Sequence, residues 1–333
     1  MRLLVGGGAG FIGSNFARVR VRGHGDEVVV LDKLTYAGRR ESLGDLEGGE
    51  RFSFVHGAIE DPAMVAAAIE GCEAVVNFAA ETHVDRSISA PDAFVTTNAQ
   101  GTYVLLEAAR ARGVRYLQVS TDEVYGSIAE GSFTEASPLA PSSPYSATKT
   151  GADLLVASYF HTYALPTLIC RGSNNYGPYQ YPEKLIPLMI LNAMHGDPLP
   201  VYGDGQNVRN WLYVEDFARG IGHVLEHGCA GETYNIGGPD ECTNLEVVKR
   251  ILELTGRDES LIEHVLDRPG HDRRYSLASE KTRALGWSPH TRFADGLERT
   301  VEWYRENAWW WEPIRTGAYR EYYERHYGRA LGS

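Results

Sequence analysis

Cysteine is scarce in this sequence, with four residues in 333, at positions 72, 170, 229 and 242, and no C-x-x-C spacing among them. So few cysteines cannot staple a chain of this length, and they indicate a reducing compartment. No apolar run approaches the ~18 to 20 residues that span a bilayer. The short run at the N-terminus lacks the length and the cleavage site of a secretory signal. We therefore expect a cytoplasmic protein with no membrane-spanning segment.

Positive charge is also in short supply. The 32 Lys and Arg residues face 44 Asp and Glu residues, which gives a formal net charge of -12. No basic run has the strength to neutralise a nucleic-acid backbone. The content of 43% hydrophobic and 23% charged residues is that of a globular protein. Nucleic acid is therefore not an expected partner, whereas a local basic pocket for a small phosphate ligand stays open.

The first half of the chain alternates short apolar runs with amphipathic stretches, a pattern typical of βαβ units around a buried parallel sheet. Strands are predicted over residues 3–5, 27–31, 52–56, 74–78, 116–120 and 167–171. Helices are predicted over residues 11–22, 62–70, 93–112 and 144–163. The fold class is therefore α/β, a doubly wound parallel sheet of the Rossmann type, which binds ligands outside the carboxyl ends of its strands.

The sequence becomes turn-rich near residue 172, with many aromatic residues and prolines between predicted helices at 185–194, 244–254 and 294–307. A chain of 333 residues exceeds the usual size of one core. We predict a nucleotide-binding domain over residues 1–171, to which later segments return, and a smaller loop-rich α/β lobe over 172–333 for the substrate. The tail from 309 to 333 begins with three tryptophans and is expected to dock on the body or on a partner.

A glycine-rich turn follows the first predicted strand and opens the first helix. Gly7, Gly10 and Gly13 allow a tight turn, the close approach of a pyrophosphate and the packing of helix on sheet. Asp32 ends the second strand, where its carboxylate can accept hydrogen bonds from an adenosine ribose and would repel a 2′-phosphate. The pattern predicts NAD as the cofactor, although the neighbouring Lys33 argues mildly for NADP.

A second group of residues predicts acid–base chemistry. Tyr145 and Lys149 stand four residues apart on a predicted helix, so they share a face, and the ammonium can stabilise a tyrosinate that acts as a general base. Thr121, Asp122 and Glu123 follow the fifth strand, at the edge where a doubly wound sheet builds its site. A hydroxyl and two adjacent carboxylates there can supply a hydrogen-bond donor, a general acid and a general base.

Together, the glycine turn and the Tyr-x-x-x-Lys motif resemble the extended short-chain dehydrogenase/reductase family over nearly the whole chain. More narrowly, segments 32–38, 79–87, 120–126 and 174–180 resemble the dTDP-glucose 4,6-dehydratases, a branch of that family. The adjacent Asp122 and Glu123 are the specific feature, because relatives that only epimerise or oxidise C4 generally lack this pair. The resemblance implies the following contacts to NAD: Gly7, Gly10, Phe11, Ile12, Gly13, Asp32, Lys33, Thr35, Ala58, Ile59, Ala79, Ala80, Tyr145 and Lys149.

The resemblance also implies the reaction, in which dTDP-glucose becomes dTDP-4-keto-6-deoxyglucose and water. Tyr145 would take the proton of the sugar 4-hydroxyl while NAD accepts the C4 hydride, with Thr121 at the 4-oxygen and Lys149 at the ribose and the phenol. Glu123 would then take the C5 proton and Asp122 would protonate the leaving 6-hydroxyl, after which the hydride returns to C6. Asp122 must therefore be protonated while Glu123 is ionised.

Further contacts, to the nucleotide sugar, are implied by the same resemblance. They are Thr82, Asn175, Glu183, Lys184, Leu185, Pro200, Tyr202, Arg209, Asn244, His271 and Tyr275. The sequence departs from the family pattern at Gly6 in place of Thr, at Gly172 in place of a Cys near the nicotinamide, and at Ala58 in place of an acidic residue near the adenine. We expect Ala58 to weaken adenine recognition, with partial loss of bound NAD during purification.

The expected assembly is a homodimer, since relatives pair two long helices per subunit into a four-helix bundle and segments 93–112 and 144–163 match those helices. No metal is expected, because His83, Asp85 and Arg86 cluster without further ligands. Three other functions stay open: a dehydratase of a UDP-, CDP- or GDP-linked hexose, a nucleotide-sugar C4 epimerase, and a non-catalytic nucleotide-binding Rossmann protein.

Overall fold

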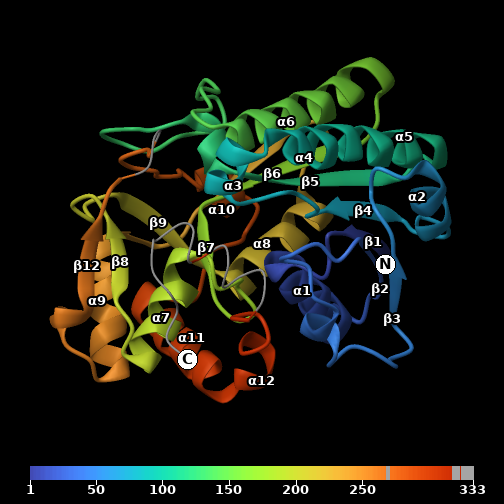
Figure 1. Ribbon diagram of the computed structural model, residues 1–333. Helices are drawn as coiled ribbons and strands as arrows, with labels where there is room; N and C mark the ends of the chain where they lie inside the picture. The colour runs from blue at the N-terminus through green and yellow to red at the C-terminus, as the bar shows by residue number, and fades with distance from the viewer. Residues whose placement is uncertain (268–270, 317–322, 324–333) are drawn as a thin grey trace.

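Seven parallel strands form the central sheet of the computed structural model, which describes residues 1–267, 271–316 and 323. Their order across the sheet is β10-β6-β5-β4-β1-β2-β3 (Figure 1). The strands are β1 (Arg2–Gly6), β2 (Glu27–Asp32), β3 (Phe52–His56), β4 (Ala74–Asn77), β5 (Arg115–Thr121), β6 (Thr167–Gly172) and β10 (Thr233–Ile236). Helices cover both faces, so the predicted doubly wound fold of the Rossmann type is confirmed.

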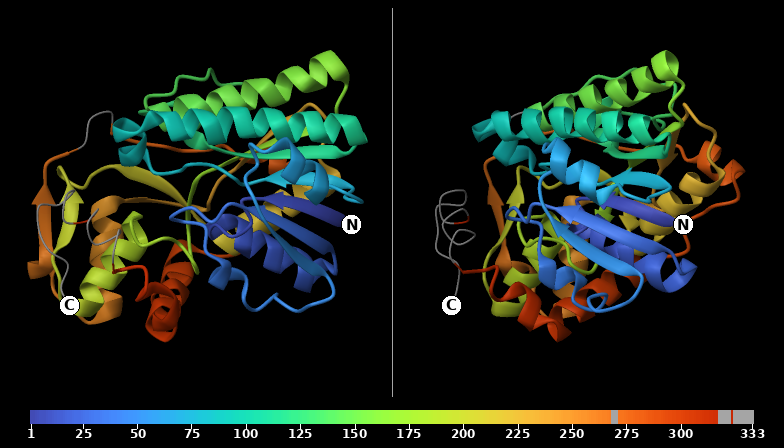
Figure 2. Two further views of the ribbon diagram at one scale, coloured as in Figure 1. Left: turned by 45° about the vertical axis from the view of Figure 1, so that its right-hand side comes forward. Right: turned by 90° about the vertical axis from the view of Figure 1, so that its right-hand side faces the viewer.

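Alternate residues of each strand enter two separate cores, because side chains along a strand point to opposite faces. Leu3 and Val5 of β1 lie in the core beneath α1 (Phe11–Arg18) and α8 (Val214–His227). Leu4 lies in the core beneath α2 (Pro62–Ala68), α5 (Thr102–Arg112) and α6 (Pro144–Tyr163). Figure 2 shows α5 and α6 side by side along one face of the sheet in both views. The parallel strands thus end together at one edge, where the site is built.

Two predicted helices differ from the observed ones in detail. The helix predicted over 11–22 becomes α1, which ends at Arg18 and continues in wider turns over Val19–His24. The helix predicted over 93–112 is divided into α4 (Pro91–Phe94), the wide-turned η3 (Val95–Gly101) and α5, and α3 (Val84–Ser89) precedes it. Among the described helices, none is both long enough and apolar enough to cross a membrane.

Helix α8 and strand β10 come from the second half of the chain and were not predicted. In α8, Gly220 and Gly222 lower the helix propensity of the sequence. Packing explains them, since a Cβ on Gly220 would lie 3.0 Å from the Trp287 ring and one on Gly222 would lie 2.8 Å from Nη1 of Arg20. The helix is therefore held by the sheet beneath it and by close contacts that only glycine permits.

The second lobe consists of two small sheets and a helical layer around one apolar core. The sheets have the orders β11-β9-β7 and β12-β8. Their strands are β7 (Asn174–Tyr176), β8 (Leu199–Tyr202), β9 (Val208–Tyr213), β11 (Asp240–Thr243) and β12 (Ile262–Val265). The helices are α7 (Leu185–His195), α9 (Asn244–Thr255), α11 (Phe293–Glu306) and α12 (Ala308–Trp311), whereas α10 (Glu280–Ala284) packs against β10 of the central sheet. Helices α7, α9 and α11 match the three predicted helices to within one residue at each end.

The start of the tail docks on the body of the molecule. Trp310 and Trp311 are buried in the core of the second lobe, whereas Trp309 is exposed. The indole Nε1 of Trp310 donates a hydrogen bond to Oγ of Ser42, 3.0 Å away in the N-terminal half. The rest of the tail, residues 317–322 and 324–333, lies outside the described residues.

Candidate active site

The turn between β1 and α1 leaves no room for side chains at two of its glycines. Gly7 has a φ of 73°, and a Cβ there would lie 2.4 Å from the backbone nitrogen of Ala79. A Cβ on Gly13 would lie 2.3 Å from the carbonyl oxygen of Gly7. Gly10 is the N-cap of α1 and has no side chain to occupy the helix N-terminus. The helix therefore presents backbone N–H groups to an anion, which fits the pyrophosphate of a dinucleotide.

Asp32, the last residue of β2, is buried beside this turn. One carboxylate oxygen accepts a hydrogen bond from the backbone N–H of Ala9 at 2.9 Å, and the other accepts one from the N–H of Leu34 at 2.8 Å. Burial raises the pKa of Asp32, although these backbone hydrogen bonds act in the opposite direction. The carboxylate is thus held rigidly at the edge where an adenosine ribose would bind.

Lys33 is occupied by two neighbours from other elements. Its Nζ donates to Oε1 of Glu60 at 2.7 Å and to Oγ1 of Thr97 at 2.8 Å. Because the ammonium already has a carboxylate as its counter-charge, the argument that Lys33 serves a 2′-phosphate is weakened.

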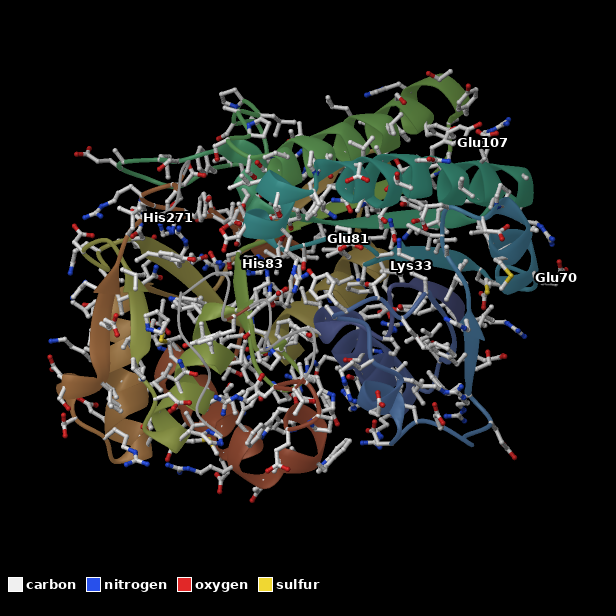
Figure 3. All side chains as sticks on the ribbon, in the orientation of Figure 1. Lys33, Glu70, Glu81, His83, Glu107 and His271 are labelled. Carbon is white, nitrogen blue, oxygen red and sulfur yellow. The ribbon has the colours of Figure 1, made fainter. Side chains whose placement is uncertain are left out.

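One cavity runs from the glycine turn to the catalytic motif. Sequence-predicted residues that line it are Gly7, Gly10, Phe11, Ile12, Gly13, Asp32, Lys33, Thr35, Ile59, Ala79, Ala80, Thr82, Thr121, Asp122, Glu123, Tyr145, Lys149, Asn175, Glu183 and Lys184. Predicted contacts that lie outside this lining are Ala58, Leu185, Pro200, Tyr202, Arg209, Asn244, His271 and Tyr275. In Figure 3, Lys33 and Glu81 lie near each other at the strand ends, and His271 lies on the side of the second lobe.

Two elements carry the catalytic motif to the cavity. Strand β5 ends at Thr121, whose Oγ1 accepts a hydrogen bond from the N–H of Glu123 at 3.2 Å and so caps the short helix η4 (Asp122–Tyr125). On the facing side, the Ser143 side chain forms a capping box at the start of α6. This cap fixes the first turn of α6, so Tyr145 and, one turn later, Lys149 reach the same cavity.

Asp122 has the properties of an acid that is protonated near neutral pH. Its side chain is buried, and its Oδ2 has no hydrogen-bond partner among the described residues. Burial and the adjacent charge of Glu123 raise the pKa of Asp122 to about 7, while the charge of Arg209 acts in the opposite direction. Two neighbouring carboxyl groups in different environments can therefore hold one proton between them.

Tyr145 and Lys149 are also buried. The Nζ of Lys149 donates to the carbonyl oxygen of Val119 at 2.7 Å, and burial lowers the Lys149 pKa to about 8, against the opposing charge of Asp153. Burial and the charge of Glu123 raise the pKa of Tyr145, with a smaller opposing effect of the hydrogen bond with Thr121. This rise in the Tyr145 pKa is opposite to the fall that the sequence predicts from the charge of Lys149. The reason is that burial penalises a tyrosinate and the nearby carboxylates repel it.

Arg209 and Tyr275 lie beside the acid pair although they do not line the cavity. The Arg209 guanidinium stacks over the Tyr275 ring at 4.3 Å, and its Nη2 donates to the carbonyl oxygen of Asp272 at 2.9 Å. The charge of Arg209 acts on Asp122, and the charge of Glu123 acts on Tyr275. The second lobe thus brings a guanidinium and a phenol to the carboxyl groups of Asp122 and Glu123.

Two of the remaining predicted contacts of the second lobe, Tyr202 and His271, lie together. The rings of Tyr202 and His271 meet edge to face at 5.9 Å, and Nδ1 of His271 lies 2.6 Å from Oδ1 of Asp267. Pro200 lies on β8 with Tyr202, and Asn244 opens α9 after the cap residue Thr243. Aromatic rings and amide groups of this kind suit a nucleotide base.

Contacts across the cavity tie the two halves of the chain together. Nζ of Lys184 donates to the carbonyl oxygen of Thr82 at 3.0 Å. Glu183 forms an ion pair with Arg86 at 3.0 Å, and the Arg86 guanidinium lies over the Tyr36 ring at 4.0 Å. The two lobes therefore meet at the segment that the sequence predicts for the substrate.

Several lining residues were not assigned to the site from the sequence. They are Leu31, Ala37, Gly38, Gly57, Glu60, Phe78, Glu81, Thr97, Val119, Ser120, Ser173, Asn174, Gln180, Tyr181 and Phe217. Gly172, which the resemblance places near the nicotinamide, also lines the cavity. Phe217 comes from α8, and a Cβ on Gly172 would lie 2.4 Å from its ring. The ring therefore fills the space that a side chain at position 172 would need, a pairing of distant residues that no local motif reveals.

No group of three His, Cys, Asp or Glu side chains within the described residues could hold a metal ion. His83 and Asp85 lie close, with Nδ1 and Oδ2 3.8 Å apart, and both are largely buried.

A family comparison covers most of the chain. The family described as GDP-mannose 4,6 dehydratase matches residues 4–300. The chain belongs to this family. Within it, a curated dTDP-glucose 4,6-dehydratase of Streptomyces niveus is 53% identical over 323 residues, which cover 95% of this chain and 96% of the relative. The dTDP-glucose 4,6-dehydratase 1 of Escherichia coli is 49% identical, with 98% of this chain and 99% of the relative covered.

A solved member of the family has the same fold. The dTDP-glucose 4,6-dehydratase of Streptomyces venezuelae, whose structure contains NAD, superimposes with a TM-score of 0.92. It is 54% identical, and the match covers 94% of this chain and 100% of that chain. The likeness thus includes both the sheet and the second lobe.

Proposed function

We propose that the chain is an NAD-dependent lyase that converts dTDP-glucose to dTDP-4-keto-6-deoxyglucose and water. The observation that carries this proposal is the pair Asp122 and Glu123, placed with Tyr145 and Lys149 in one cavity. An elimination needs both an acid and a base, whereas a C4 epimerase has no use for the pair. The names of the relatives, dTDP-glucose 4,6-dehydratase, support the same reaction.

The residues of the N-terminal half fit NAD. The backbone at Gly7 and Gly13 leaves a space that any Cβ would fill. The Asp32 carboxylate, held by the N–H of Ala9, could accept hydrogen bonds from a ribose diol. When bound, NAD would supply reversible hydride transfer, with C4 of the sugar as donor and C6 as the final acceptor. The glycine turn, Asp32 and Lys149 would hold it.

Tyr145 would remove the proton of the sugar 4-hydroxyl. Its place in the cavity with Lys149 supports this role, and the Thr121 hydroxyl, which lines the same cavity, can donate a hydrogen bond to the 4-oxygen. Lys149, protonated below about pH 8, would balance the charge that forms on the phenol. The resulting 4-ketone would acidify the hydrogen on C5.

Elimination would then use the acid pair. Glu123, ionised, would take the C5 proton, and Asp122, protonated because burial raises its pKa to about 7, would give its proton to the departing 6-hydroxyl. Water would leave, and the proton on Glu123 would be available for return to C5. The burial of Asp122 supports this division of roles.

The second lobe would hold the nucleotide. Arg209 would bind the diphosphate, because a guanidinium forms paired hydrogen bonds with phosphate oxygens. Its charge acts on Asp122, so the diphosphate would lie near the acid pair. Tyr202 and His271, whose rings are in contact, and Asn244 would contact the base. We keep the division of the chain into a domain of residues 1–171 with returning segments and a substrate lobe of residues 172–333 as part of this proposal.

A homodimer is also proposed, through a four-helix bundle built from α5, α6 and their counterparts. Large apolar side chains are exposed on this layer, namely Val95 at 55%, Tyr103 at 49%, Leu154 at 59% and Tyr163 at 52%. Such a set on helices that already cover the sheet supports a partner surface. A cytoplasmic location belongs to the proposal as well, supported by four cysteines that are all free.

The test is direct. Purified protein is incubated with dTDP-glucose and, in parallel, with UDP-, CDP- and GDP-linked hexoses, with and without added NAD. The masses of the nucleotide sugars are then measured by mass spectrometry. We expect loss of one water from dTDP-glucose alone. Loss of water from another nucleotide sugar only would overturn the base assignment, and no loss from any of them, with NAD present, would overturn the lyase proposal.

A further inference from the structure

A buried carboxylate lies one helical turn beyond Lys149. Asp153 follows Lys149 by four residues on α6, so the two side chains share a face of the helix. Both side chains are buried. Helix α6 packs on β5, β6 and η4 (Figure 1), so this face is turned toward the sheet and away from solvent. The reaction proposed above gives Asp153 no role.

Arg171 and Tyr125 hold the Asp153 carboxylate in place. Nε of Arg171, on β6, donates to Oδ2 of Asp153 at 2.9 Å, and Nη1 donates to the Tyr125 hydroxyl at 2.8 Å. That hydroxyl donates in turn to Oδ1 of Asn235, on β10, at 2.9 Å. All of these side chains are buried. Because Tyr125 is the last residue of η4, the hydrogen bonds join α6 to the short helix that carries the acid pair.

The pairing with Arg171 leaves one oxygen of the Asp153 carboxylate without a donor. Oδ1 is buried and has no hydrogen-bond partner among the described residues. A charge in such surroundings acts more strongly on its neighbours than it would in water. Burial lowers the pKa of Lys149, and the charge of Asp153 acts in the opposite direction. The same charge acts on Tyr116 of β5.

The other groups around Lys149 supply no such balance. Its Nζ donates to the carbonyl oxygen of Val119 on β5, and a carbonyl carries no full charge. Asp122 and Glu123 of η4 line the same cavity, but their charges raise the pKa of Tyr145, together with the larger effect of burial. The carboxylate that favours the ammonium therefore comes from the helix of Lys149 itself.

We propose that Asp153 is the counter-charge of the Lys149 ammonium, held in place by Arg171 and Tyr125, and is thus a positioning residue for the base. The proposal rests on the function proposed above, in which a protonated Lys149 balances the charge on the phenol of Tyr145. Without the charge of Asp153, burial would leave Lys149 neutral over more of the pH range. The phenolate would lose its cation, and oxidation at C4 would slow.

The experiment titrates Lys149 directly. The chain contains five lysines, so the NMR spectrum of protein isotope-labelled at the lysine ε carbon is simple, and the signal that Lys149→Met removes belongs to Lys149. The full chain with saturating NAD is titrated in each case. In Asp153→Asn the midpoint of this signal should fall by ~1 pH unit or more relative to the unsubstituted protein. This readout does not depend on the reaction.

Turnover of dTDP-glucose should follow the same change. Relative to the unsubstituted protein, Asp153→Asn should lose ~5-fold or more in kcat between pH 6 and pH 8 as Lys149 loses its proton. KM should change little, because Asp153 does not line the cavity. Asp26→Asn is the matched control, since Asp26 forms another buried ion pair, with Arg20, and precedes β2 at the amino end of the sheet. It should weaken the fold and leave the Lys149 midpoint unchanged.

The outcomes separate this proposal from the proposed function. An Lys149 midpoint that is unchanged in Asp153→Asn, or that falls equally in Asp26→Asn, would overturn the role of Asp153, whatever the protein does with dTDP-glucose. If the midpoint falls as expected but the unsubstituted protein removes no water from dTDP-glucose, the proposed function fails and Asp153 is still the counter-charge of Lys149.

Asp153→Asn leaves the Arg171 guanidinium buried without its partner, which can prevent folding. In that case the double variant with Arg171→Met removes the unpaired charge and tests the same point. Its Lys149 midpoint should also fall, because the carboxylate is absent there too. An unchanged midpoint in the double variant would contradict the proposal.

Discussion

Replacing Asp122 by asparagine should inactivate the protein and, at the same time, stabilise it above neutral pH. The carboxyl is buried, and burial together with the charge of Glu123 raises its pKa from 3.8 to about 7. The unfolded chain releases the Asp122 proton near pH 4, whereas the folded chain keeps it up to about pH 7. Folding stability therefore falls as pH rises through this window and is constant above it. The amide side chain of the Asp122→Asn variant would have nearly the same shape and no proton to lose.

The difference between the two pKa values corresponds to about 4 kcal/mol. We expect Asp122→Asn to raise the free energy of unfolding by up to roughly this amount at pH 8, and by less than half of it at pH 5. Activity should fall by ~100-fold or more, because the leaving 6-hydroxyl loses its acid. A catalytic residue that weakens the fold is the trade-off expected at active sites.

The assay is urea unfolding of both proteins at pH 5 and pH 8 with saturating NAD, together with turnover followed by mass spectrometry. Asp295→Asn, at an exposed position, is the control for the loss of a carboxylate and should show no such pH-dependent gain. If Asp122→Asn is no more stable than the unsubstituted protein at pH 8, or gains equally at both pH values, the reasoning from burial is wrong.

Three further changes test other parts of the structure. Tyr145→Phe should bind NAD normally and lose ~10²- to 10⁴-fold in turnover, because the base at the 4-hydroxyl is gone; full turnover would refute its role. Gly172→Ala should destabilise by ~1 to 3 kcal/mol in urea unfolding, since a Cβ would lie 2.4 Å from the Phe217 ring. The double variant with Phe217→Leu should recover much of the loss, and no recovery would contradict the clash. Trp310→Ala should cost ~3 to 5 kcal/mol, because it empties a buried site and leaves the Ser42 hydroxyl without its donor; a change below ~1 kcal/mol would show that the tail start does not stabilise the body.

The parts of the fold that the sequence predicted are those encoded by neighbouring residues. The strands from β1 to β6 are short apolar runs, and the helices α7, α9 and α11 show their pattern within a few turns. The glycine turn, Asp32 and the Tyr145 to Lys149 spacing are also local, because backbone geometry and helix period set them within one or two elements. These features were enough to predict the Rossmann fold, whereas many of the residues that line the cavity were named only through the resemblance to a known family.

Long-range packing decided the rest. The seventh strand, β10, and the helix α8 join the first half of the chain from beyond residue 200, and α8 brings Phe217 to Gly172. The hydrogen bonds from Lys33 to Glu60 and Thr97 join three separate segments of the chain, so no spacing in the sequence reveals them. The sequence alone determined that an acid pair exists, but the burial of Asp122, which raises its pKa, arises only in the folded chain. Burial depends on what the rest of the chain places nearby, and that is a property of the folded molecule.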